Sequence, residues 1–72
     1  MLVVDIKKNK AKSINNKGTS AADYNFDDTH FQIWGYKDGD LKRGGNPTQQ
    51  LTFDVDMAKE LRDAINTFLL GK

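Results

Sequence analysis

The most regular pattern of apolar and polar positions lies at the end of the chain. From Ala58 onward apolar residues recur at helical spacing, and charged residues such as Lys59 and Asp63 fall between them. Asp54 or Asp56 can cap a helix here, because a carboxylate accepts the free backbone N–H groups of the first turn. The pattern predicts an amphipathic helix at about residues 55–70, with its apolar stripe in the core. The stripe consists of Ala58, Leu61, Ala64, Ile65, Phe68 and Leu69.

Two earlier stretches alternate with a period of two, which is typical of β-strands. Residues 30–36 place Trp34 and Tyr36 on one face, and residues 49–53 alternate in the same way. One helix covers only one face of a sheet, and we expect it to cover the face opposite Trp34 and Tyr36. The covered face then consists of Phe31, Ile33, Leu51 and Phe53.

The rest of the chain gives weaker strand patterns. Residues 2–6 are apolar and β-branched and predict a first strand, and residues 11–14 predict a weak second one. Tyr24 and Phe26 indicate either a short strand or two side chains that pin a loop to the core. The expected fold is one α+β domain over residues 1–72, with a small antiparallel β-sheet of three to five strands and one C-terminal amphipathic helix packed on one face.

The length of 72 residues sets a further expectation, because a chain of this size buries only roughly 60% of the surface that it exposes when unfolded. A homodimer would add burial. The absence of cysteine excludes disulfides and fits a reducing compartment. No stretch has the pattern of a signal peptide or the length of a membrane span, so we expect a cytoplasmic protein without a membrane partner.

The charge is unevenly distributed along the chain. Residues 1–22 carry five lysines against Asp5, a balance of +4, and the remainder has a balance of −3. The lysine-rich segment suits a polyanion or is simply a solvated loop. Lys42 and Arg43 precede two glycines, which either allow a backbone to approach an anion closely or simply shape the turn. The candidate residues for binding a nucleic acid or nucleotide are Lys7, Lys10, Lys12, Lys17, Trp34, Tyr36, Lys42 and Arg43.

Catalytic chemistry is poorly represented in the sequence. There is one histidine and no cysteine, and the two serines, Ser13 and Ser20, lie in expected loops. Asp38 and Asp40 resemble the start of a calcium loop, but Gln49 stands where a bidentate glutamate would be required. We therefore predict a protein that is not an enzyme and that needs no metal and no cofactor.

The second half of the chain resembles the positive cofactor four family, coactivators that bind single-stranded DNA. That family has a strand of the type Ile-Arg-x-Tyr, a hairpin with glycine and a basic cluster, a strand like Gly-Ile-Ser-Leu, and an amphipathic helix. The matching segments here are Ile33–Tyr36, Leu41–Gly45, Gln50–Phe53 and the helix positions Leu61 and Ile65. Trp34 replaces the family's strand arginine. The resemblance implies a homodimer that packs through its helices and grips a single strand on the opposite, concave sheet face.

Three functional hypotheses follow from these patterns. The first is binding of single-stranded nucleic acid, in which Trp34 and Tyr36 stack on bases and the basic residues neutralise phosphates. The second is a small phage-type inhibitor that blocks a host defence enzyme or sequesters a nucleotide signal. The third is that Trp34 and Tyr36 bury themselves in a homodimer without any ligand. The nine acidic residues after residue 22 oppose binding to a long polyanion.

Overall fold

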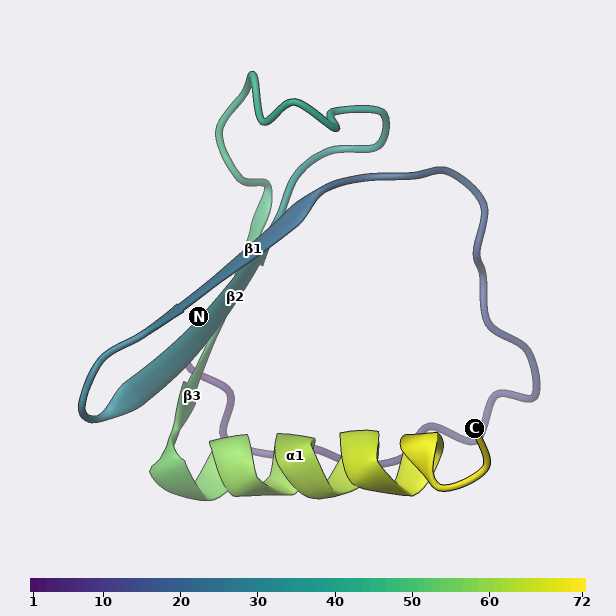
Figure 1. Cartoon of the computed structure of the whole chain (residues 1–72), viewed down its shortest axis with the longest axis vertical. Helices are drawn as coiled ribbons and strands as arrows, with labels where there is room; N and C mark the ends of the chain where they lie inside the picture. Colours follow the sequence, from purple (N-terminus) through teal and green to yellow (C-terminus); the bar gives the residue numbers. More distant parts are fainter.

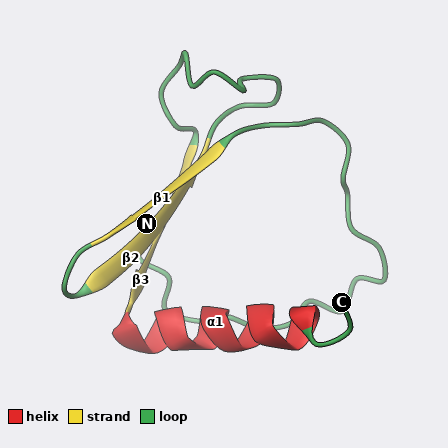
Figure 2. Ribbon diagram, viewed as in Figure 1, coloured by secondary structure: helices red, strands yellow, loops and turns green.

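The computed structural model describes all 72 residues as a three-stranded antiparallel sheet followed by one helix (Figures 1 and 2). The strands are β1 (Ala22–Phe26), β2 (His30–Gly35) and β3 (Gln49–Asp54), and they lie in the order β1-β2-β3. The helix is α1 (Val55–Leu69). The small α+β fold predicted from the sequence is therefore confirmed.

The strand register sorts the side chains of the sheet into an apolar and a polar face. Two rows of paired residues form the apolar face: Phe26, Phe31 and Phe53 in one row, and Tyr24, Ile33 and Leu51 in the next. The ring of Phe31 stacks against those of Tyr24 and Phe26, with centroids 6.0 and 6.5 Å apart. Tyr24 and Phe26 thus belong to a strand, the first of the two possibilities left open by the sequence.

The N-terminus lies beside β3 but forms much less sheet than predicted. The Val3 N–H donates to the Thr52 carbonyl at 2.8 Å, and the Thr52 N–H donates to the Met1 carbonyl at 2.7 Å. These bonds make a single parallel bridge between Leu2 and Thr52. The strand predicted over residues 2–6 is wrong in extent, because the chain leaves β3 after this bridge.

The weak strand predicted at residues 11–14 does not form. All residues from 7 to 20 are exposed, and none of them belongs to a strand. The segment runs from the N-terminal bridge past the helix and returns to β1, and along this path it pairs with neither edge strand of the sheet (Figure 1). A short apolar pattern without a neighbouring strand cannot satisfy its backbone hydrogen bonds in a sheet.

The helix begins at the residue that follows β3. Asp54 is the cap, and its Oδ1 accepts a hydrogen bond from the Met57 N–H at 2.9 Å. Because no loop separates β3 from α1, the helix leaves the end of the sheet instead of turning back across it (Figure 1). The bounds of the predicted helix and one of its two candidate caps are confirmed.

The apolar stripe of the helix contacts the sheet only near its start. Met57, Ala58 and Leu61 are half-buried, whereas Ile65 and Phe68 are exposed. The prediction that the whole stripe is core is wrong within this chain, because only the first turns of the helix reach the sheet. Phe53 is the one buried residue, with 3% of its surface exposed. The helix is neither long nor apolar enough to cross a membrane.

Candidate binding face

The sheet face that points away from the helix carries polar side chains and the only tryptophan. Its rows of paired residues define the polar face: Asp23, Trp34 and Gln50 in one row, and Asn25, Gln32 and Thr52 in the next. As the alternation predicted, Trp34 lies opposite the face that contacts the helix. It is half-buried between its neighbours on the outer strands.

At one end of the polar face, three side chains form a hydrogen-bonded cluster. The Tyr36 hydroxyl donates to Asp23 Oδ2 at 2.9 Å, and Arg43 Nε donates to Asp23 Oδ1 at 2.7 Å. Arg43 also donates to the Ala22 carbonyl, and its guanidinium lies 6.0 Å from the centre of the Tyr36 ring. Trp34 pairs with Asp23 across β1 and β2, so the structure places Trp34, Tyr36 and Arg43 around one aspartate; all three were predicted from the sequence.

Asp23 is the acidic centre of this cluster. The hydrogen bond from Arg43 and then that from Tyr36 hold the pKa of the Asp23 carboxyl below its ordinary value, because both favour the ionised form. The side chain of Arg43 remains 46% exposed, so part of it is still open to solvent although two of its nitrogens already donate hydrogen bonds. The charge of Arg43 is shared with Asp23, which reduces what it contributes to binding a phosphate.

The long loop between β2 and β3 is closed by its own carboxylate. Asp40 Oδ1 accepts from the Gly44 N–H at 2.9 Å, and Asp40 Oδ2 accepts from the Gly45 N–H at 3.1 Å. These bonds lower the pKa of Asp40. One expectation was that the two glycines let the backbone approach an external anion. This is wrong here, because the Asp40 carboxylate, four and five residues before them, already accepts hydrogen bonds from their N–H groups.

A second aspartate ties the same loop to the N-terminal segment. Asp38 Oδ1 accepts from the Thr19 N–H at 2.8 Å, and the Gly39 N–H donates to the Thr19 carbonyl at 2.6 Å. Gly18 packs so closely that a Cβ there would lie 2.5 Å from Asp38 Oδ1, and its φ of +82° also favours glycine. The loop that carries Lys42 and Arg43 is therefore fixed at its base.

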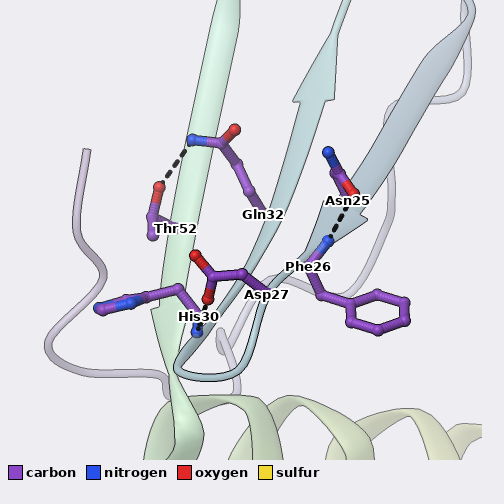
Figure 3. Close-up of a pocket in the computed structure, with 6 residues that line it drawn as sticks. All are labelled: Asn25, Phe26, Asp27, His30, Gln32 and Thr52. Atoms are coloured by element: carbon purple, nitrogen blue, oxygen red, sulfur yellow. Dashed lines mark hydrogen bonds between the residues drawn. The ribbon is translucent and has the colours of Figure 1, made fainter.

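The opposite end of the polar face forms a surface depression of about 400 Å³ (Figure 3). Asp27 closes the turn between β1 and β2, where it accepts from the backbone N–H groups of Thr29 and His30 at 2.9 and 2.8 Å. These two bonds lower the pKa of Asp27. Gln32 donates to the Thr52 hydroxyl at 2.9 Å across β2 and β3. The depression is thus lined with hydrogen-bonding groups, which are Asn25, Asp27, His30, Gln32 and Thr52.

His30 was not among the residues predicted to bind. Its ring nitrogen Nδ1 lies 2.8 Å from the Thr29 hydroxyl, and its backbone pairs with Asp54. The alternation of β2 places His30 on the face of Trp34, and that was the signal that could have included it. No group of three or more histidine, aspartate or glutamate side chains is placed to hold a metal ion.

The predicted lysines lie apart from the aromatic cluster. Lys7 lines a depression against α1 together with Lys8, Glu60 and Asp63, and it pairs with Asp5 at 3.7 Å. The structure therefore does not bring Lys7 onto the polar face. The remaining predicted lysines are exposed and form no ion pair; they are Lys10, Lys12, Lys17 and Lys42.

Comparison with protein-family models, curated proteins and solved structures gave no match. The resemblance to the positive cofactor four family thus rests on the residues of the strand, loop and helix motifs alone. The chemistry of the polar face has to carry any functional hypothesis. That face combines two aromatic side chains and an arginine at one end with amide, hydroxyl and imidazole groups at the other.

Proposed function

We propose that this protein is a non-catalytic binding protein that takes single-stranded nucleic acid on the polar face of its sheet. One observation carries the proposal: Trp34, Tyr36 and Arg43 all lie beside Asp23, at one end of the sheet face that the helix does not cover. A flat face with aromatic rings and a cation is what single-strand binders use, since every base has a face that can stack. The cytoplasmic location expected from the sequence is part of this proposal.

The two ends of the polar face would contact different parts of the strand. Trp34 and Tyr36 stack on bases, and the exposed edge of Arg43 donates to a phosphate. At the other end, Asn25 and Gln32 offer amide groups to base edges. Such contacts tolerate many sequences, so we expect weak sequence preference.

The exposed lysines supply attraction over a longer range. Lys10, Lys12 and Lys17 form no ion pair and lie on the segment outside the sheet. Their charges raise the local potential without fixing a strand in one place, and salt screens them. The polar face would therefore determine where a strand binds, and the lysines would determine how steeply binding depends on salt.

Titration with a single-stranded DNA oligonucleotide at two salt concentrations tests the proposal. Because Trp34 is the only tryptophan, its fluorescence reports stacking directly, and binding should quench it. Trp34→Ala, followed with a labelled oligonucleotide, should weaken binding by about 1 to 3 kcal/mol and leave the salt dependence intact. Absence of binding at low salt would overturn the proposal and favour a protein target or a small nucleotide.

A matched pair of lysine variants separates the two contributions. Lys10→Ala combined with Lys12→Ala should flatten the slope of log affinity against log salt by up to about 0.7 per lost phosphate contact. Lys59→Ala, on the helix, removes a charge away from the N-terminal segment and should leave the slope unchanged. If the unmodified protein and both variants gave the same slope of log affinity against log salt, the N-terminal lysines would not contact the strand.

A further inference from the structure

The isolated chain exposes far more surface than a folded protein of its size. Its accessible surface is 6506 Å², whereas a folded monomer of 8.1 kDa exposes roughly 4,500 Å². Its radius of gyration is 13.8 Å, compared with about 11 Å expected for 72 residues. The exposed segment from 7 to 20 contributes to this excess. The segment does not explain, however, why Phe53 is the only buried residue of the sheet and the helix.

Part of the excess accessible surface lies on two exposed apolar surfaces, one on the sheet and one on the helix. On the sheet, Tyr24 and Phe26 are 69% and 68% exposed, and Leu51 is 41% exposed; we call these three residues the sheet patch. On the helix, Ile65, Phe68 and Leu69 are 46%, 66% and 51% exposed; we call them the helix patch.

The helix patch cannot reach the sheet patch of its own chain. It continues the stripe that begins at Ala58 and Leu61, which are half-buried in the part of the helix that lies nearest the sheet. The Asp54 cap joins β3 to α1 without a loop, so the helix leads the patch away from the sheet. Folding the helix back would break the cap and the first helical turn.

We propose that the occupant of these surfaces is a second copy of this chain, with the helix patch of each copy packed on the sheet patch of the other. One chain offers two unlike apolar surfaces, and a two-fold axis satisfies both at once and leaves neither uncovered. A standard interface buries about 800 Å² on each partner, which is less than half of the excess of roughly 2,000 Å² and leaves room for the share that the segment from 7 to 20 contributes. The polar face stays outside, so this dimer does not depend on nucleic-acid binding.

The first test uses the unmodified protein. Sedimentation equilibrium at micromolar concentration should give twice the chain mass of 8.1 kDa, and the midpoint of thermal unfolding should rise with protein concentration, because association stabilises only the folded form. A folded species of one chain mass, with a midpoint independent of concentration, would overturn the proposal.

Two charge variants locate the interface on the helix. Phe68→Glu places a carboxylate in the helix patch and should abolish the two-chain species, whereas Asn66→Glu adds the same charge two residues away, off the stripe, and should preserve it. If Phe68→Glu fails to fold at all, its loss of circular dichroism at concentrations where Asn66→Glu is folded still supports an obligate dimer. A two-chain Phe68→Glu protein would contradict the proposal.

Cross-linking distinguishes exchange of helices onto sheets from pairing of helix with helix. The chain has no cysteine, so Tyr24→Cys and Leu69→Cys each introduce a single thiol. A mixture of the two, exchanged and then oxidised with oxidised glutathione, should give a disulfide-linked pair that neither variant gives alone. Replacing Leu69→Cys by Asn66→Cys should remove this product. Efficient linkage of Leu69→Cys to itself would instead show that the helices pair with each other.

Discussion

The two faces of the sheet differ in how far contacts within one chain provide their side chains with partners. On the polar face, Gln32 bonds to Thr52, and Asp23 bonds to both Tyr36 and Arg43. No buried side-chain nitrogen or oxygen lacks a hydrogen-bond partner. On the apolar face, large rings remain in solvent although the strands beneath them are fully paired.

The difference follows from what polar and apolar side chains each need in order to be stable. A polar side chain is satisfied by one neighbour at the right distance or by water, so a three-stranded sheet can complete its polar face alone. An apolar face gains free energy only when more protein covers it. The polar face therefore resembles a surface made for solvent and ligand, and the apolar face resembles half of an interface.

The largest expected effect is on the apolar face. Phe53→Ala removes the only buried side chain and should lower the free energy of unfolding by about 3 to 5 kcal/mol, enough to unfold a small domain. Urea denaturation followed by circular dichroism measures it. Gln50→Ala, in the same strand on the polar face, is the control and should change stability by less than about 0.5 kcal/mol. Similar losses in both variants would remove the distinction between the faces.

A smaller effect is expected at the joint between sheet and helix. Asp54→Ala removes the carboxylate that accepts from the Met57 N–H and should cost about 1 kcal/mol. Asp54→Asn keeps an acceptor oxygen and should recover most of this loss. Thermal unfolding of the two variants measures the difference, and equal midpoints for Asp54→Ala and the unchanged protein would show that the cap does not hold the helix direction.

On the polar face, a single hydrogen bond should matter less. Gln32→Ala removes the donor to the Thr52 hydroxyl and should cost roughly 0.5 to 1 kcal/mol, because water replaces part of the lost bond. Denaturant titration checks this value. A loss as large as that of Phe53→Ala would mean that the polar face is buried in the working protein, contrary to its proposed role as a ligand surface.

The smallest effect is expected from acid. The pKa values of Asp23, Asp27 and Asp40 are lowered in the folded chain, so their contributions are fully present above the unfolded value of about 3.9 and are lost as pH falls through the folded values. The thermal midpoint should therefore be insensitive to these groups near neutral pH and fall below about pH 4. Asp23→Asn should show a smaller acid-induced fall than the unchanged protein, and an equal fall would assign the acid sensitivity elsewhere.

Periodic patterns made the strongest elements predictable. Helical spacing after Ala58 and an aspartate before it identified α1, and alternation placed Trp34 opposite Phe31. These features depend on side chains within a few residues of each other, which the sequence displays directly. The same logic failed at residues 11–14, because a strand also needs a partner that local sequence does not reveal.

The candidate site was predictable in its residue types and only partly in its arrangement. Sequence alone identified Trp34, Tyr36 and Arg43 as a possible binding group, but it could not show that Asp23 links two of them. Nor could it show that Asp40 accepts hydrogen bonds from the N–H groups of Gly44 and Gly45, or that Lys7 lies against the helix. Those contacts depend on how the long loop and the N-terminal segment return to the sheet.

The sequence by itself determined the α+β class, the approximate bounds of the helix, and which face of β2 and β3 is apolar, because periodicity is a local property of the chain. Only the tertiary structure decided where the helix points. No residue separates β3 from α1, so the helix extends away from the sheet. The second half of its apolar stripe, which the sequence assigns to the core, is therefore exposed. Burial depends on which elements meet in space, and an apolar pattern states only that a partner is needed.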